Sequence, residues 1–295
     1  MNRAPDFIVI GAMKCATSTL HEQLAAQPGF FLSTPKEPCF FSDDEVYARG
    51  WEWYTGLFAG ARAGDVCGES STHYTKLPTY PRTVERMARH LSNVRLIYMM
   101  RHPIDRLVSQ YIHEWTQRTI DGPIDEAVQR FPRLIDYGRY GMQLRPYFEA
   151  FGRDRVLPVF QERLHHQPQA ELERVCRFIG YTGIPRWQQE LSAANVSSER
   201  LRKSAWRDAL LHWPGMTTLR RRLVPRSVRD RIKRLWTMNE RPKLGDARLA
   251  ELRRVYNDDL GELGSWLGIE LTCENFKEAA AQRPLEWAAT AGTGR

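Results

Sequence analysis

A lysine and three hydroxyl side chains follow a short apolar run near the start of the chain. The apolar run spans residues 7–10, and a helical pattern begins at Leu20. The first amides of a helix have no intrahelical acceptor, and the helix dipole and a nearby lysine both favour an anion. The sequence therefore predicts a phosphate-binding loop between strand and helix. Its residues are Gly11, Ala12, Met13, Lys14, Cys15, Ala16, Thr17, Ser18 and Thr19.

The position of the lysine separates this loop from the common ATP-binding loop. That loop places a glycine directly before the lysine, in the order G-x-x-x-x-G-K-[ST]. Here Met13 precedes Lys14, and the nearest preceding glycine is Gly11. We therefore expect the loop to bind a phosphate-containing ligand other than ATP.

A second group of phosphate-binding side chains follows a later predicted strand. Arg101 comes directly after the apolar strand 95–100, and Pro103 begins a predicted helix that carries Ser109 two turns further on. A guanidinium group can donate two parallel hydrogen bonds to one phosphate. We expect Arg101 and Ser109 to bind one phosphate together.

Short apolar runs alternate with helical patterns along the chain, which has 295 residues, 42% of them hydrophobic and 26% charged. This alternation predicts an α/β fold with a mainly parallel central sheet flanked by helices. Ligands bind such sheets at the carboxyl ends of the strands. Strands are expected at 7–10, 66–69, 94–100 and 156–160, and helices at 80–91, 103–115, 143–151, 169–179 and 246–267.

We predict a single domain over residues 1–275. Within it, residues 195–243 are expected to form a helical, basic cover segment, and residues 244–270 a C-terminal helix. Residues 276–295 are expected to form a tail, because its last part consists of small and polar residues.

The net charge of +8 comes largely from a basic run between Arg220 and Arg234. Such a run is either a solvated helical face, a grip for an anionic ligand, or a contact to nucleic acid or a membrane surface. No zinc-finger, basic-zipper or RNA-binding motif accompanies it, so we expect no nucleic-acid partner. Peripheral membrane contact through 220–234 stays an alternative.

The start of the chain has no signal-peptide pattern, and no window of about 18 apolar residues is long enough to span a bilayer. Five cysteines are present, without a Cys-x-x-Cys pair. An odd number of widely spaced cysteines predicts free thiols rather than disulfides or a zinc site. We therefore expect a cytoplasmic protein without an integral membrane segment.

Several motifs together resemble a known family. The loop 11–20 resembles the 5′-phosphosulfate loop of sulfotransferases that use 3′-phosphoadenosine 5′-phosphosulfate (PAPS), and 101–111 resembles their 3′-phosphate motif. Residues 35–41 are similar to the Lys-Glu-x-x-Phe-Phe segment of heparan-sulfate-type sulfotransferases. Residues 50–54 and 68–74 also match that branch and its bacterial relatives. The resemblance is dense from residue 6 to about 180 and thinner to 271.

The resemblance implies a P-loop-like three-layer fold and transfer of a sulfuryl group from PAPS to a hydroxyl, leaving 3′,5′-adenosine bisphosphate. It implies that Lys14 contacts the bridging oxygen and that residues 11–19 hold the phosphosulfate. Arg101 and Ser109 would hold the 3′-phosphate, and Lys203 is assigned to the nucleotide from the basic segment. The resemblance implies no metal.

Two residues compete for the role of general base. Glu37 matches the glutamate that serves this role in the branch. His73 is the alternative, because an ordinary imidazole pKa near 6.5 suits proton abstraction at neutral pH. Ser70 stands where the heparan-sulfate enzymes have a lysine, so Lys36 or Lys76 is expected to replace that cation.

The acceptor is expected to be a carbohydrate or small molecule with a hydroxyl group. Residues 115–142 and 195–240 are expected to shape its pocket, with aromatic side chains that suit a sugar, a phenol or a lipid head group. The aromatic residues expected there are Trp53, Tyr74, Trp115, Tyr140 and Trp206. The competing functions are an ATP-dependent small-molecule kinase and a non-enzymatic polyanion-binding protein.

Overall fold

Five parallel strands form the central sheet of the computed structural model, which describes residues 3–194 and 241–288. Their order is β2-β3-β1-β4-β5, and every neighbouring pair is parallel. The four predicted strands are confirmed. The added strand β2 escaped prediction because three residues cannot display a period. The strands are β1 Phe7–Gly11, β2 Phe30–Leu32, β3 Val66–Ser70, β4 Arg95–Met100 and β5 Val156–Phe160.

Helices connect and cover the strands. Those nearest the predicted site are α1 Thr17–Ala25, the 3-10 helix η1 Thr72–Thr75, α4 Thr83–His90, α5 Pro103–Thr116 and α8 Tyr140–Phe151. The others are α2 Asp44–Tyr47, α3 Trp51–Gly56, α6 Ile124–Arg130, α7 Arg133–Asp136, η2 Arg153–Arg155, α9 Gln161–His166, α10 Pro168–Ile179, α11 Gln189–Ala194, α15 Asp246–Leu267 and α16 Phe276–Gln282.

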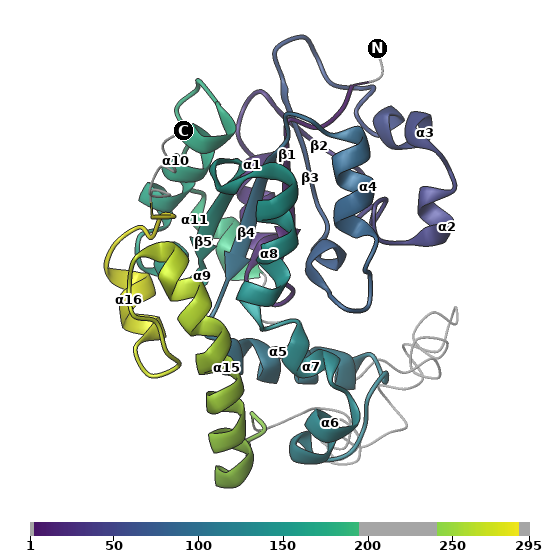
Figure 1. The fold of residues 1–295 in the computed structure, drawn as a ribbon. Helices are drawn as coiled ribbons and strands as arrows, with labels where there is room; N and C mark the ends of the chain where they lie inside the picture. Colours follow the sequence, from purple (N-terminus) through teal and green to yellow (C-terminus); the bar gives the residue numbers. More distant parts are fainter. Residues whose placement is uncertain (1–2, 195–240, 289–295) are drawn as a thin grey trace, which may run out of the picture.

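The connections place helices on both faces of the sheet, which confirms the predicted three-layer architecture. Helix α1 leads from β1 toward the β2 edge, whereas α4 and α8 lead toward β5. Because parallel crossovers are right-handed, connections in opposite directions lie on opposite faces. Helices α4 and α8 accordingly pack against each other, and α1 packs on β1, β2 and β3 (Figure 1).

The sheet is buried on both faces, which explains the continuous apolar runs in the sequence. Every residue of β1 and of β5 is buried. In the register, Ile8 of β1 lies between Glu69 of β3 and Leu96 of β4. Since all strands run the same way, their carboxyl ends meet at one edge. The loops after residues 11, 32, 70 and 100 therefore leave the sheet on the same side.

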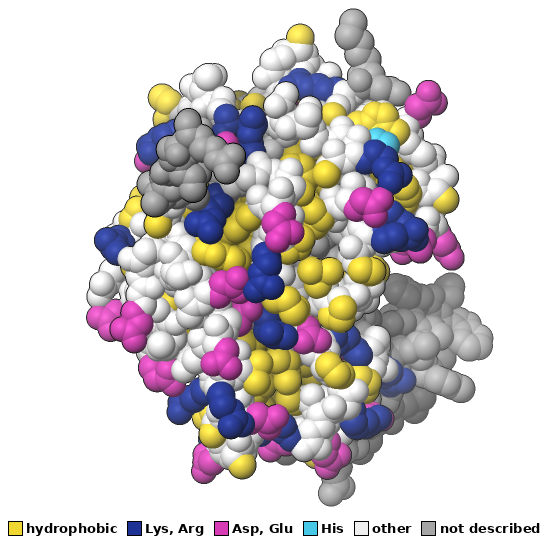
Figure 2. Space-filling model, in the orientation of Figure 1, with side chains coloured by type: hydrophobic (Ala, Val, Ile, Leu, Met, Phe, Trp, Pro, Cys, Tyr) yellow, Lys and Arg dark blue, Asp and Glu magenta, His cyan; other side chains and the backbone are white. Residues whose placement is uncertain are grey.

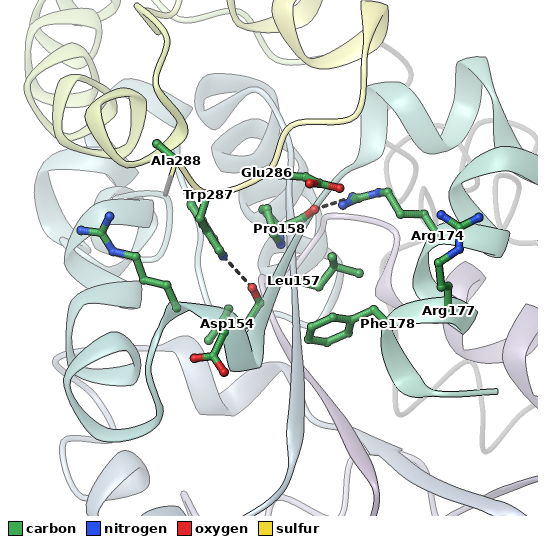
Figure 3. A pocket seen from close by; sticks show the side chains of 11 residues that line it. Asp154, Leu157, Pro158, Arg174, Arg177, Phe178, Glu286, Trp287 and Ala288 are labelled. Carbon is green, nitrogen blue, oxygen red and sulfur yellow. Dashed lines mark hydrogen bonds between the residues drawn. The ribbon is translucent and has the colours of Figure 1, made fainter. Parts of the chain in front are cut away.

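Side chains cover the free edge of β5. Trp287 Nε1 donates a hydrogen bond to the Val156 carbonyl oxygen at 2.6 Å, and Arg174 Nη2 donates to the Pro158 carbonyl oxygen at 2.5 Å. Pro158 has no N–H group to offer another strand. Beside this edge lies a cavity of about 440 Å³ (Figure 3). Because it adjoins the first half of β5, it is separate from the carboxyl edge of the sheet.

The C-terminal helix α15 spans Asp246–Leu267, as predicted. The ordered chain continues past the expected boundary at residue 275, because α16 follows and its Phe276 is fully buried, as is nearly all of Leu285. Most of the expected cover segment 195–243, including the basic run 220–234, lies outside the described residues.

On the face drawn in Figure 2, basic and acidic side chains are interspersed rather than gathered by sign. Among the helices that the structure describes, none is both long and apolar enough to cross a membrane.

Candidate active site

The loop between β1 and α1 turns sharply at the carboxyl end of β1. Its Ala12 amide is not available to a ligand, contrary to the expectation, because it donates to the Met99 carbonyl oxygen at 2.7 Å and the residue is fully buried. Gly11 has φ +146°, and a Cβ there would lie 1.9 Å from Thr75 Oγ1, so only glycine fits. Lys14 and Ala16 have left-handed backbones, with φ of 70° and 64°. Ala16 caps α1 without a side-chain hydrogen bond, and the first turn contains no acidic residue. No side-chain cap and no acidic side chain therefore compete with an anion at the first amides of α1, and anion binding there stays a prediction.

The buried Tyr140 connects this loop to the second phosphate motif. Cys15 Sγ lies 3.8 Å from Tyr140 Oη. The same hydroxyl donates to the Arg101 carbonyl oxygen at 2.5 Å and accepts from the Arg101 amide at 3.2 Å. The backbone of Arg101 is thus fixed beside the loop. Burial raises the pKa of Cys15 to about 12, so this thiol is a packing group rather than a nucleophile.

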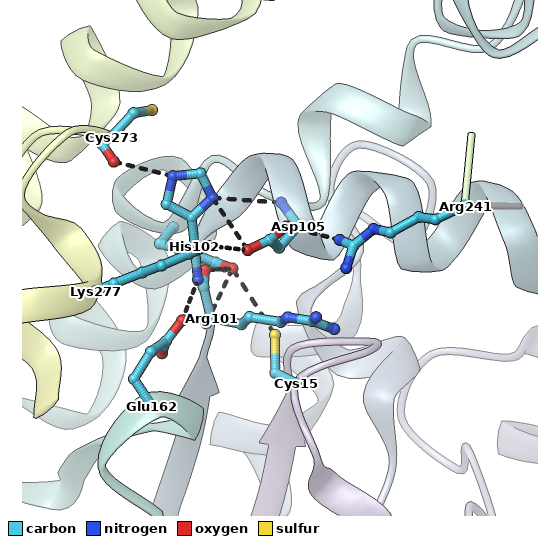
Figure 4. Close-up of polar contacts among 9 residues, drawn as sticks. Cys15, Arg101, His102, Asp105, Glu162, Arg241, Cys273 and Lys277 are labelled. Atoms are coloured by element: carbon cyan, nitrogen blue, oxygen red, sulfur yellow. Dashed lines mark hydrogen bonds and ion pairs between the residues drawn. The ribbon is translucent and has the colours of Figure 1, made fainter. Parts of the chain in front are cut away.

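The start of α5 is held in place by the C-terminal part of the chain. His102 Nε2 lies 2.9 Å from the Cys273 carbonyl oxygen. The backbone amide of His102 donates a hydrogen bond to Glu162 Oε1 at 2.8 Å. Asp105 forms ion pairs of 2.6 Å with both Arg241 and Lys277 (Figure 4). Burial raises the pKa of Asp105, but these cations outweigh it and leave the pKa below its ordinary value.

Arg101 and Ser109 are both partly exposed, the first directly after β4 and the second inside α5. Arg101 lies at the carboxyl edge of the sheet because it follows β4 directly. The joint binding of one phosphate by Arg101 and Ser109 stays a prediction.

Lys36 connects the phosphate loop to the candidate base. Its Nζ donates to Ser18 Oγ at 2.6 Å and lies 3.8 Å from Glu37 Oε1. Burial lowers the pKa of Lys36, while the charge of Glu37 partly offsets this effect. A cation therefore sits between the first turn of α1 and the carboxylate of Glu37.

Both candidate bases lie at the same point. Thr72 Oγ1 donates to Glu37 Oε2 at 3.2 Å, and the Glu37 amide donates to the Ser70 carbonyl oxygen at 3.1 Å. A ring nitrogen of His73 lies within 4.8 Å of the Glu37 carboxylate. Burial, together with the charge of Lys76, lowers the pKa of His73 to about 4. The argument for His73 from an ordinary pKa of 6.5 therefore fails, since the sequence did not reveal its burial.

Lys76 is the second cation beside Glu37. Its side chain is largely buried, and burial lowers its pKa while Glu37 raises it. Lys36 and Lys76 both interact electrostatically with Glu37, so both remain candidates for the cation that the chain lacks at Ser70.

A buried carboxylate that sequence analysis did not single out as functional supports this site. Glu69 accepts hydrogen bonds from Tyr54 Oη at 2.9 Å, Tyr74 Oη at 2.7 Å and Ser71 Oγ at 2.6 Å. Ser71 Oγ also accepts from the Cys39 amide at 3.1 Å, which ties the end of β3 to the loop of Glu37. Burial raises the pKa of Glu69 to about 7 despite these three donors. An acidic residue within a buried strand was the available signal.

Two aromatic residues expected at the acceptor pocket are part of the core instead. Tyr140 is fully buried and Tyr74 is 2% exposed. Their hydroxyls are engaged with Arg101 and Glu69, so neither ring is accessible to an acceptor. Trp206 and Lys203 lie outside the described residues.

The fold is that of an α/β protein with a glycine-containing strand-to-helix loop at the carboxyl edge of a parallel sheet. The sulfotransferase domain family matches residues 4–221, which is well over half of the chain. The chain belongs to the sulfotransferase family.

Similarity to individual proteins agrees with this assignment. Mouse heparan sulfate glucosamine 3-O-sulfotransferase 3B1 is 31% identical over 190 residues, which cover 61% of this chain and 47% of that protein. The bovine bifunctional heparan sulfate N-deacetylase/N-sulfotransferase 2 is 25% identical over 212 residues, covering 64% and 23%. A crystallised sulfotransferase from Alicyclobacillus acidocaldarius superimposes with a TM-score of 0.55 at 25% identity, covering 65% and 90%. The chain spans less than half of the length of the mouse relative and less than a quarter of the length of the bovine one.

Proposed function

We propose that the protein transfers the sulfuryl group of PAPS to a hydroxyl of a carbohydrate or small-molecule acceptor. The observation that carries this proposal is the contact of Lys36 with both Ser18 and Glu37. It joins an anion-binding helix start to a carboxylate, so a donor phosphosulfate and an acceptor hydroxyl would meet there.

The donor would be held by two groups of residues. The amides of residues 13–19 and the hydroxyls of Thr17, Ser18 and Thr19 would bind the phosphosulfate, with Lys14 on the bridging oxygen. Arg101 and Ser109 would bind the 3′-phosphate. The Arg101 backbone is held by Tyr140, which also contacts Cys15 of the loop, and this supports the assignment of Arg101. Lys203 stays a prediction for the nucleotide.

Glu37 would act as the general base. During transfer the acceptor oxygen forms a bond to sulfur, the bond from sulfur to the phosphate oxygen breaks, and Glu37 takes the hydroxyl proton. Lys14 and Lys36 would stabilise the charge that develops on the departing phosphate. Thr72 orients the carboxylate through Oε2, which leaves Oε1 toward Lys36. The reaction as written needs no metal ion.

The acceptor class rests on the relatives, whose names state transfer to the glucosamine of heparan sulfate. With Lys36 and Lys76 beside Glu37, an acceptor that carries negative charge would be attracted to the base. We therefore propose a hydroxylated acceptor, tested first among anionic carbohydrates and then among phenols and small alcohols.

A donor experiment tests the proposal. Calorimetry should show binding of 3′,5′-adenosine bisphosphate without Mg²⁺, and labelled PAPS should transfer its label to an acceptor of the panel. Binding of ADP alone, and only with Mg²⁺, would support the kinase alternative instead. The cytoplasmic location also stays a prediction, which fractionation of the native cells would test.

A further inference from the structure

Three side chains that commonly ligate metals come together beside the candidate base. They are Glu37, Cys39 and His73, which offer a carboxylate oxygen, a sulfur and a ring nitrogen. The three ligand atoms lie within 4.8 Å of one another. The proposed transfer gives Cys39 no function, although its sulfur lies close to the carboxylate of the candidate base.

The fold fixes the two segments that carry these residues. The Glu37 amide donates to the Ser70 carbonyl oxygen, and the Cys39 amide donates to Ser71 Oγ, both at 3.1 Å. His73 lies two residues beyond Ser71, in η1. The backbone distances between the three ligands are therefore set before any ion binds, which lowers the entropy cost of binding.

Ion binding requires loss of the Cys39 thiol proton, and burial raises the pKa of this thiol to about 12. A cation bound directly to the sulfur would offset this cost, because its charge favours the thiolate. His73 Nδ1 is buried and has no hydrogen-bond partner among the described residues, and the ring is stacked on Tyr80 at 4.9 Å. Cys39 is a free, half-buried cysteine. Glu37 keeps one oxygen on Thr72, while the other faces Lys36 at 3.8 Å.

The mixed set of nitrogen, oxygen and sulfur selects among ions. Mg²⁺ and Ca²⁺ prefer oxygen ligands alone, whereas Zn²⁺ accepts all three types in a tetrahedral arrangement. Bonds of 2.0–2.3 Å place tetrahedral ligand atoms about 3.5 Å apart. Side-chain rotations that move the ligand atoms by about 1 Å would therefore bring all three to bonding distance of one ion.

We infer that Glu37, Cys39 and His73 form a Zn²⁺ site whose occupation inhibits the enzyme. The bound ion occupies the Glu37 carboxylate, which then cannot remove the proton from the acceptor hydroxyl. The inhibition of sulfuryl transfer rests on the proposed function, whereas the binding of Zn²⁺ to these three residues does not. Lys36 and Lys76 interact electrostatically with the same carboxylate, so their positive charges weaken the binding of the ion.

A cobalt titration of the reduced, metal-free full chain tests the site. Co²⁺ should bind at one equivalent and give the thiolate-to-cobalt charge-transfer absorption, and Zn²⁺ should displace it. Cys39→Ser should abolish this absorption and weaken Zn²⁺ binding by at least about tenfold. His73→Gln should weaken binding similarly. Cys176→Ala, which removes a buried thiol outside the group, is the matched control and should bind as the wild type does.

Binding that persists unchanged in Cys39→Ser, or that lacks the charge-transfer absorption, would refute the site. In transfer assays, Zn²⁺ should inhibit the wild type, and Cys39→Ser should need at least about tenfold more Zn²⁺. Ligand-dependent binding without inhibition would refute the occupation of the base. If no sulfuryl transfer is found at all, the proposed function fails, and the cobalt titration still decides the metal site.

Discussion

Replacement of Glu69 by Gln should change how the stability of the protein depends on pH. The Glu69 side chain is fully buried and accepts three hydroxyl hydrogen bonds. Burial raises its pKa from the ordinary 4.5 to about 7. Glutamine has nearly the same shape but does not titrate, so the comparison isolates the charge of one buried carboxyl group.

The sign follows from proton linkage. A carboxyl whose pKa is raised in the folded state binds its proton more tightly there than in the unfolded chain. Its contribution is fully present below pH 4.5 and is lost as the pH rises through about 7. The pKa difference of about 2.5, at 1.36 kcal/mol for each pKa unit, corresponds to about 3 kcal/mol. Relative to Glu69→Gln, the wild type should therefore lose about 3 kcal/mol across this range.

Urea denaturation at a series of pH values between 4 and 8.5 measures this difference. Glu85→Gln removes an exposed carboxylate of α4 and serves as the control for loss of a surface charge. Tyr54→Phe removes one donor to Glu69, so it should shift the loss of stability to higher pH. A free-energy difference between the wild type and Glu69→Gln that does not change with pH would refute the reasoning.

Four further substitutions test the proposed roles. Glu37→Gln should lower turnover by about 10² to 10⁴ with donor affinity nearly unchanged, as initial rates and calorimetry will measure, and near-full activity would move the base to His73. Lys14→Ala should weaken donor binding and also slow transfer in single-turnover assays, and normal values of both would exclude its role. Arg101→Ala should mainly raise the donor Kd, and an unchanged Kd would remove it from the 3′-phosphate site. Tyr140→Phe should cost about 1–3 kcal/mol in urea denaturation, because the Arg101 amide and carbonyl oxygen lose their partner. An unchanged midpoint would contradict that contribution.

The elements that sequence analysis located are those with a local signal. The runs 7–10, 94–100 and 156–160 are apolar throughout because parallel strands are covered on both faces. Helix α15 shows apolar residues at helical spacing, and Gly180 ends α10 with φ +89°. Strand β2 has three residues and no such signal. The parallel pairing of β2 with β3 is visible only in the structure.

The sequence by itself determined the sheet class and the family, because strand patterns, loop residues and their spacing are local properties that motifs preserve. The tertiary structure decided which residues share the site. The pairing of β2 with β3 brings the loop that carries Lys36 and Glu37 to His73 in η1, although these two segments are far apart in the chain. It also decided their protonation, since burial depends on packing from every side. The pKa of His73 near 4 and that of Glu69 near 7 follow from that packing.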